Sequence, residues 1–251
     1  MTAQLADKVQ RSFSRSFQTY NDTASQQAWV ARKLVSEMRR VGAPNRFDVA
    51  FELGCGTGHL TRLLRQNFGL PDLYLNDIAP QARATADAEN AAFIAGDVRL
   101  VEWPAKLDLV ASASMIQWLA TPAGLLQQVA AALEPGGWLA ISGFGPLQYQ
   151  ELAQIGSTAR APGLCLPDTL AAAIDGPFKI LTVGQSVRPS YFDTPREVLK
   201  HLRSTGVNGR ARGAWTRSPL ARFGAAYVQK FGTDGRVPLT YHPVWVIAEK
   251  R

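Results

Sequence analysis

The feature that most constrains the fold is a glycine-rich turn between an apolar run and a helix-like segment. Residues 49–53 (Val-Ala-Phe-Glu-Leu) are followed by Gly54, Gly56 and Gly58, which stand at every second position. Glycine lets the backbone turn sharply and lets a ligand approach without meeting a Cβ atom. A helix that begins directly after such a turn offers unpaired N–H groups to polar or anionic ligand atoms. The stretch therefore predicts a strand, a ligand-binding loop and a helix.

The glycine spacing narrows the choice of ligand. The pattern Glu-x-Gly-x-Gly-x-Gly begins at Glu52. It differs from the Gly-x-Gly-x-x-Gly fingerprint of dinucleotide sites and lacks the Gly-Lys-Ser/Thr ending of a phosphate-binding loop. It resembles the first motif of class I S-adenosylmethionine-dependent methyltransferases. The resemblance implies that the loop wraps the methionine part of this cofactor and that Glu52 lies near its ammonium group.

Two further acidic residues follow two further apolar runs, Asp77 after residues 73–75 and Asp97 after residues 91–95. An acid at the end of the second strand of a βαβ unit is placed to accept hydrogen bonds from ribose hydroxyls. Asp97 matches the position where this methyltransferase class contacts the adenine amino group. One aspartate after a strand is more often a helix cap or a turn residue. Three acids on three strand ends favour a cofactor site. The expected cofactor-binding residues are Glu52, Gly54, Cys55, Gly56, Gly58, Asp77, Ile78, Asp97, Val98 and Ser112.

Apolar runs alternate with helix-like segments from about residue 48 to residue 142. This alternation predicts an α/β fold with a parallel sheet, helices on both faces and ligand-binding loops at the carboxyl ends of the strands. The expected class is a Rossmann-like class I methyltransferase with a seven-stranded, mostly parallel sheet. We expect strands at 48–53, 72–77, 91–95, 107–113, 137–142, 177–187 and 239–248, and helices near 58–68, 79–89, 121–133, 148–158, 194–205 and 219–231.

The N-terminal segment carries apolar and aromatic residues at helical spacing, with a break near Asn21. We expect residues 1–44 to form a helical lid and residues 45–251 to form the methyltransferase domain. Insertions into that domain are expected at about 145–176 and 206–232, where the strand–helix alternation is interrupted.

Composition excludes some classes of protein. No apolar run approaches the ~20 residues that span a bilayer, and the N-terminus lacks a hydrophobic signal core. These features predict a cytoplasmic protein that does not bind membranes. The 2 cysteines and 3 histidines have no ligand spacing, so no metal site is expected.

Positive charge is concentrated in one region. The chain has 27 Lys+Arg against 20 Asp+Glu, and residues 196–222 hold seven basic residues with one acid, Glu197. Such a stretch is either a solvated basic face or a docking patch for an acidic macromolecule. Nucleic acid is the usual first candidate for the partner. The segment after the fourth strand has no Asn-Pro-Pro-Tyr-like or Asp-Pro-Pro-Tyr-like motif, which base-methylating enzymes often carry.

Several segments resemble the malonyl-[acyl-carrier protein] O-methyltransferase family of biotin synthesis, over nearly the full chain. One departure is Ser142-Gly143, where the family has Ser-Thr, and residues 156–176 show little similarity. The similar segments are 13–21 with Ala24 and Gln26, 112–118, 138–146 with Glu151 and Leu152, 202–209 and 239–241.

The resemblance implies methyl transfer from S-adenosylmethionine to the free carboxylate of a malonyl thioester on acyl-carrier protein, with S-adenosylhomocysteine as product. Tyr20 would cover the cofactor, Gln117 would border the reacting methyl, and Arg203 would receive the carboxylate. Each residue also has a structural alternative. Tyr20 could serve helix packing, Gln117 could be a surface glutamine beside a core tryptophan, and Arg203 could be an ordinary surface arginine. The acidic carrier would dock on Arg196, Lys200, Arg203, Arg210 and Arg212.

Three other functions remain open at this stage. The chain could methylate a small carboxylic acid or a quinone precursor, which would need no basic docking surface. It could methylate nucleic acid. It could also be a non-catalytic subunit that binds the cofactor, but the intact glycine loop and the three acids argue against this alternative.

Overall fold

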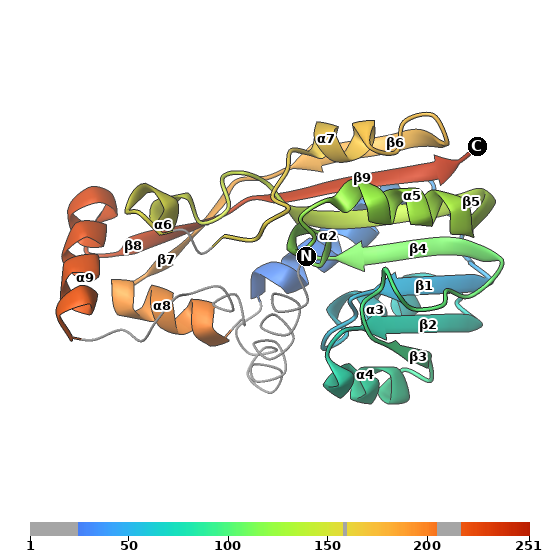
Figure 1. Ribbon diagram of the computed structural model, residues 1–251, viewed down its shortest axis with the longest axis horizontal. Helices are drawn as coiled ribbons and strands as arrows, with labels where there is room; N and C mark the ends of the chain where they lie inside the picture. The colour runs from blue at the N-terminus through green and yellow to red at the C-terminus, as the bar shows by residue number, and fades with distance from the viewer. Residues whose placement is uncertain (1–24, 158–159, 205–216) are drawn as a thin grey trace.

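A seven-stranded sheet forms the centre of the molecule in the computed structural model, which describes residues 25–157, 160–204 and 217–251 (Figure 1). The strand order is β3-β2-β1-β4-β5-β9-β6. Strands β1 to β5 pair in parallel, and β9 is antiparallel to both neighbours. The predicted fold class is confirmed. The strands are β1 Val49–Leu53, β2 Asp72–Asp77, β3 Ala92–Ala95, β4 Leu107–Ala113, β5 Leu133–Phe144, β6 Phe178–Gln185 and β9 Pro243–Lys250.

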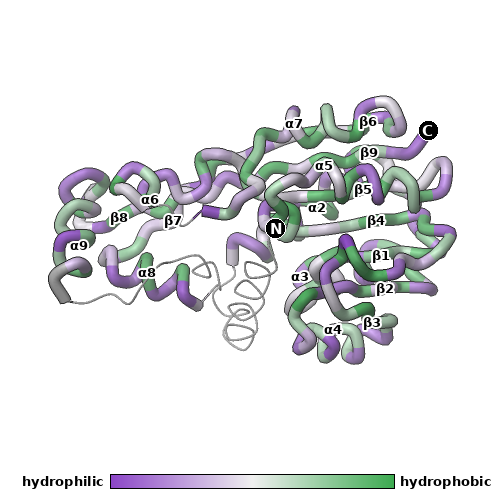
Figure 2. Tube along the Cα trace, viewed as in Figure 1, coloured by the Kyte–Doolittle hydropathy of each residue, from purple (hydrophilic) through white to green (hydrophobic). Residues whose placement is uncertain are grey.

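Helices cover both faces of this sheet because apolar side chains alternate along the strands. Ala50 of β1 belongs to one buried cluster, with residues of α2 (Ser25–Arg40), α3 (His59–Asn67) and the segment that ends in α4 (Arg83–Ala88). Phe51 belongs to the other, with residues of α5 (Pro122–Ala132) and α7 (Pro167–Ala172). The central strands are correspondingly apolar in Figure 2.

A smaller unit lies beyond the carboxyl ends of β1 and β4 (Figure 1). It contains a two-stranded sheet and has its own buried cluster, in which Tyr227, Leu239 and Tyr241 are fully covered. Val30 of α2 joins this cluster, so α2 connects the two units. The elements of the smaller unit are β7 Arg188–Phe192, β8 Val237–Tyr241, α6 Gln150–Gln154, α8 Pro195–Ser204 and α9 Arg217–Phe231.

The single strand predicted over 239–248 is wrong. The strand is interrupted at His242, so that β8 belongs to the small sheet and β9 belongs to the large one. Contacts from distant segments fix the break: the His242 N–H donates to Gln148 Oε1 at 2.8 Å, and Leu147 N–H donates to Nδ1 of the imidazole at 3.1 Å. The apolar pattern runs through this point, which is why the sequence predicts one strand. Strand β7 and helix α7 were not predicted.

Two predicted helices are shorter than expected. The segment 148–158 forms only α6, and the segment 79–89 is a 3₁₀ turn at Pro80–Ala82 followed by α4. The described part of the expected lid, α2, packs on α3 and on the large sheet. Residues 1–24 lie outside the described residues, so the lid stays a prediction. No helix of the described part is long and apolar enough to cross a membrane.

The contact between α6 and β8 inside the smaller unit generates a stability prediction. Glu151 of α6 is 3% exposed and accepts hydrogen bonds from the N–H of Thr240, at 2.9 Å, and from its hydroxyl. The variant Glu151→Ala leaves these buried donors without an acceptor, and we expect it to lower the free energy of unfolding by roughly 1–3 kcal/mol. Urea denaturation measures the effect. Exposed Glu134→Ala is the control, and equal stability of the two variants would contradict the assignment.

Candidate active site

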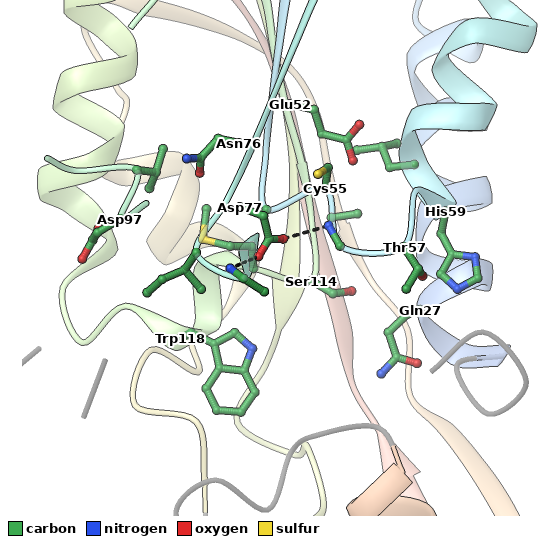
Figure 3. Close-up of a pocket in the computed structure, with 18 of the residues that line it drawn as sticks. Gln27, Glu52, Cys55, Thr57, His59, Asn76, Asp77, Asp97, Ser114 and Trp118 are labelled. Atoms are coloured by element: carbon green, nitrogen blue, oxygen red, sulfur yellow. Dashed lines mark hydrogen bonds between the residues drawn. The ribbon is translucent and has the colours of Figure 1, made fainter. Parts of the chain in front are cut away.

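A cleft that is partly open to solvent lies at the carboxyl ends of the parallel strands (Figure 3). The loops after β1, β2, β3 and β4 form it, as expected for an open parallel sheet. Helix α2 contributes Gln27 from the side. The cleft is lined by Gln27, Glu52, Gly54, Cys55, Gly56, Thr57, His59, Leu60, Asn76, Asp77, Ile78, Ala79, Gly96, Asp97, Val98, Ala113, Ser114, Met115, Trp118 and Leu119.

The glycine loop requires glycine for two reasons. Gly54, Gly56 and Gly58 have φ angles of +72°, +50° and +82°, a region that residues with a Cβ atom rarely adopt. A Cβ at Gly54 would also lie 2.6 Å from Cγ of Met115. A Cβ at Gly56 would meet nothing within 4 Å, because this residue faces the open cleft. The loop can therefore bring backbone close to a ligand.

Hydrogen bonds hold the glycine loop in place. The N–H groups of Gly54 and Cys55 both donate to the carbonyl of Asn76, each at 2.9 Å, which ties the end of β1 to the end of β2. The carbonyl of Gly56 accepts from the Thr85 hydroxyl at 2.8 Å, and the carbonyl of Thr57 accepts from the Arg62 guanidinium at 2.9 Å. The loop is thus preorganised before any ligand binds.

Asp77 lies at the end of β2 and receives backbone hydrogen bonds on both carboxylate oxygens. Gly56 N–H donates to one oxygen at 2.8 Å and Ala79 N–H to the other at 2.7 Å (Figure 3). Burial raises the pKa of Asp77, although these backbone donors oppose the shift. A carboxylate oxygen can accept more than one hydrogen bond, so both oxygens can also receive ligand hydroxyls.

Glu52 is a buried acid of the cleft whose pKa is raised. Burial, with a smaller effect from the nearby Asp77 charge, raises its pKa to about 8, and Thr61 partly opposes this through a hydrogen bond. Its Oε2 atom is buried and has no hydrogen-bond partner among the described residues. A cationic group of a ligand would satisfy this oxygen and stabilise the ionised carboxylate. The residues therefore fit the ammonium end of S-adenosylmethionine.

Asp97 lies at the opposite end of the cleft from Gln27 (Figure 3). It forms an ion pair with Arg99, whose Nε donates to Oδ1 of Asp97 at 2.9 Å and whose Nη2 donates to Oδ2. The hydrogen bond from Arg99 is the largest cause that lowers the pKa of Asp97. Asp97 is therefore ionised and held in one orientation, but contact with an adenine amino group stays a prediction.

Not every predicted residue faces the cleft. The Ser112 hydroxyl is buried and donates to the carbonyl of Leu53 at 2.8 Å. Gln117 is also buried, with its amide nitrogen donating to the Ser114 carbonyl. Its neighbour Trp118 lines the cleft (Figure 3). Gly58 caps the start of α3.

The residues expected to meet the acceptor are only partly described. Arg203 is exposed in the last turn of α8. Tyr20, Arg210 and Arg212 lie outside the described residues. Their roles stay predictions.

Five polar residues of the cleft were missed by the sequence reasoning: Gln27, Thr57, His59, Asn76 and Ser114. Gln27, Thr57 and Ser114 each have a buried side-chain oxygen without a partner in the described part of the chain. A glutamine on the apolar face of α2 could have pointed to the first, because a buried polar side chain there needs a partner. Ser114 has a φ of +59°, which places it in a sparsely populated backbone region at the cleft. No sequence signal marks that strain.

The comparisons with known proteins agree with this geometry. A family model described as a methyltransferase domain matches residues 51–139. The malonyl-[acyl-carrier protein] O-methyltransferase of Bacteroides thetaiotaomicron is 30% identical over 95% of this chain and 96% of its own length. The protein of the same name from Acinetobacter baylyi is 30% identical, with 96% of each chain covered. The chain belongs to the malonyl-[acyl-carrier protein] O-methyltransferase family.

Other similarities extend this result. A Bacteroides fragilis protein of the same name is 32% identical over 97% of this chain, which spans 50% of that longer protein. The solved structure of YcgJ from Bacillus subtilis has a TM-score of 0.62 at 11% identity and covers 88% of this chain and 99% of its own. N-methyltransferase NodS from Bradyrhizobium japonicum, solved with S-adenosylhomocysteine, has a TM-score of 0.54 at 12% identity, with 87% and 86% covered. These structures share the fold. The family uses S-adenosylmethionine, so the predicted cofactor is confirmed.

A first prediction concerns the open side of Gly56. The variant Gly56→Val places a branched side chain in the cleft, and we expect calorimetry to detect no binding of S-adenosylhomocysteine. Gly42→Val is a matched control, because Gly42 also has a positive φ of +86° and open space at its Cβ but lies in the turn after α2. Comparable loss of binding in both variants would indicate general destabilisation and contradict the assignment.

A second prediction concerns the proton on Glu52. At neutral pH its carboxyl is mostly protonated, since its pKa is about 8, whereas a bound ammonium group favours the charged form. Binding of S-adenosylhomocysteine should therefore release a proton, and affinity should rise as the pH increases toward 8. Calorimetry in buffers of different ionisation enthalpy measures the release. The Glu52→Gln variant should bind S-adenosylhomocysteine more weakly and release fewer protons on binding. An unchanged proton release would assign the proton to another group.

Proposed function

We propose that this protein transfers a methyl group from S-adenosylmethionine to the free carboxylate of a malonyl thioester on acyl-carrier protein. The product is the methyl ester that enters biotin synthesis. The main support is the coincidence of two observations. Relatives of that name align over nearly the full length of the chain, and the cleft contains Glu52, Asp77 and Asp97 from three neighbouring strand ends. We also propose that the reaction takes place in the cytoplasm, which the unpaired Cys55 and Cys165 support.

The cofactor end of the cleft follows from the site geometry. Glu52 would hold the ammonium group, the glycine loop would contact the methionine part, and Asp77 would accept hydrogen bonds from the ribose. Asp97, oriented by Arg99, would meet the adenine. When bound, S-adenosylmethionine supplies an electrophilic methyl group. The chain itself contributes fixed acceptors that need no rearrangement.

The acceptor requires little acid–base chemistry from the protein. A carboxylic acid with a pKa near 3–4 is already ionised at neutral pH, so no general base is needed to create the nucleophile. Opposite charges are neutralised in the reaction, and removal of water from the carboxylate favours it. Met115, Trp118 and Leu119 provide apolar walls for the cleft. The largest contribution would be to hold the reacting groups in line.

One face of α8 is suited to an acidic carrier. Arg196, Lys200 and Arg203 follow each other at intervals of four and three residues, which places them on the same side of the helix, and all three are exposed. Val198 and Leu202 occupy the opposite, buried side. Basic side chains arranged in this way attract an acidic surface and speed the encounter. Arg210 and Arg212, which follow in the sequence, would extend the patch.

The decisive experiment uses S-adenosylmethionine with a labelled methyl group. We expect label to appear on purified malonyl-acyl-carrier protein and to be released by mild base, as an ester is. Acetyl-acyl-carrier protein, which lacks the free carboxylate, should stay unlabelled. A base-stable product, or no product with the malonyl carrier, would contradict the proposal.

The same assay separates carrier docking from chemistry. Reversal of charge in the double variant Arg196→Glu/Lys200→Glu should raise the KM for the malonyl carrier about tenfold or more at low salt. The KM for malonyl-coenzyme A should change much less. The double variant Lys179→Glu/Arg251→Glu is the control, because these exposed residues lie at the start of β6 and just after β9, away from α8. Equal effects of the two double variants would show that net charge, and not the α8 face, matters.

A further inference from the structure

A second basic residue, at the start of β7, has a setting unlike that of Arg203. Arg188 is the first residue of β7 and is half-buried. Its guanidinium lies over the ring of Trp29, with Cζ 3.9 Å from the ring centroid, and its Nε donates to Oε1 of Gln26 at 3.2 Å. Gln26 in turn donates to the hydroxyl of Ser190 at 3.0 Å. The guanidinium is therefore held in one plane by two residues of α2.

No carboxylate neutralises this guanidinium in the described part of the chain. Arg188 takes part in none of the ion pairs there, and its hydrogen bond to Gln26 uses Nε. A partly desolvated cation without a counter-charge is costly, and an anion would stabilise it. An arginine stacked on an aromatic ring keeps its edge available, and the two terminal nitrogens form the fork that fits a carboxylate.

Arg188 is not itself one of the residues that line the cleft, but two features of the fold bring the start of β7 toward it. On one side, its hydrogen-bond partner Gln26 directly precedes Gln27, which lines the cleft (Figure 3). On the other side, Arg188 pairs with Tyr241 of β8, and two residues later Pro243 pairs with Phe144, the last residue of β5. The carboxyl end of β5 adjoins that of β4, whose continuation supplies Ser114 and Trp118 to the cleft.

The geometry points to Arg188 as the residue that recognises the free carboxylate of the acceptor, with Trp29 and Gln26 as its positioning residues. This inference rests on the proposed function and replaces Arg203 in that role. Arg203 is exposed, so water screens its charge, and it belongs to the face that would meet the carrier protein. Arg188 is preorganised and shielded. The fork would hold both carboxylate oxygens, and a remaining lone pair on one of them would face the methyl donor.

The test measures binding of short thioesters, so that carrier docking plays no part. Calorimetry on the protein saturated with S-adenosylhomocysteine compares malonyl-N-acetylcysteamine with acetyl-N-acetylcysteamine, which lacks the carboxylate. We expect the wild type to prefer the malonyl compound. Arg188→Gln should reduce the affinity for the malonyl compound about tenfold or more, because a charge-assisted pair is lost. Its affinities for the acetyl compound and for S-adenosylhomocysteine should stay unchanged.

A matched control and a conservative variant sharpen the result. Arg236→Gln removes an exposed arginine that also lies over an aromatic ring, that of Tyr191, at 5.5 Å. It should keep the preference for the malonyl compound. Arg188→Lys should restore part of the preference, since it retains the charge but not the fork. Trp29→Leu should weaken the preference while the melting temperature stays close to that of Arg188→Gln.

The outcomes distinguish this assignment from the function on which it rests. A wild type that methylates the malonyl carrier, together with an Arg188→Gln variant that keeps the malonyl preference, would overturn the role of Arg188 alone. If Arg188→Gln lowers the affinity for both thioesters equally, Arg188 is only a packing contact between α2 and β7. This result would also overturn its role in carboxylate recognition. A wild type that neither prefers the malonyl compound nor methylates the carrier would contradict the proposed function.

Discussion

The hydrogen bonds from the N–H groups of Gly54 and Cys55 to the carbonyl of Asn76 are the contact on which the site depends. They fix the ends of β1 and β2 side by side, so that Glu52 and Asp77 share one buried region and each acid has a raised pKa. Two neighbouring buried acids are unfavourable unless a ligand offsets their charge. A cation and ribose hydroxyls relieve that cost when they bind. These two hydrogen bonds convert a local turn into a binding site, because they hold the polar groups together before the ligand binds.

The cofactor end of the site could be predicted from the sequence because its signals are local. Each acid directly follows its own strand, and the sheet's parallel order brings those strand ends together without further information. Gln27 and Ser114 could not be predicted in the same way. Gln27 reaches the cleft only because α2 packs across the sheet, and Ser114 is aimed by a positive φ angle. Ser112 and Gln117 were placed by resemblance, and their hydrogen bonds to backbone carbonyls direct them elsewhere.

The smaller unit was the least predictable part of the fold for a related reason. The apolar pattern of residues 237–248 does not change at His242, yet the strand partners change there from β7 to β5 and β6. Partner choice is decided by contacts with Gln148, Leu147 and Gln185, each distant in the sequence. A period of two residues identifies a strand but not the sheet to which it belongs. Strand β7, which was not predicted, carries Arg188, so the proposed acceptor side could not be predicted from the sequence either.

The two sides of the cleft therefore rest on different kinds of interaction. The proposed cofactor side uses backbone amides, backbone carbonyls and three acids from consecutive strand ends, so we expect few substitutions there to preserve binding. The proposed acceptor side uses side chains from α2, β7 and α8, which meet only through tertiary packing. Side chains on separate elements can change one at a time without disturbing the glycine loop. A fold built in this way can keep one methyl donor while the acceptor changes, because donor and acceptor are held by structurally independent parts.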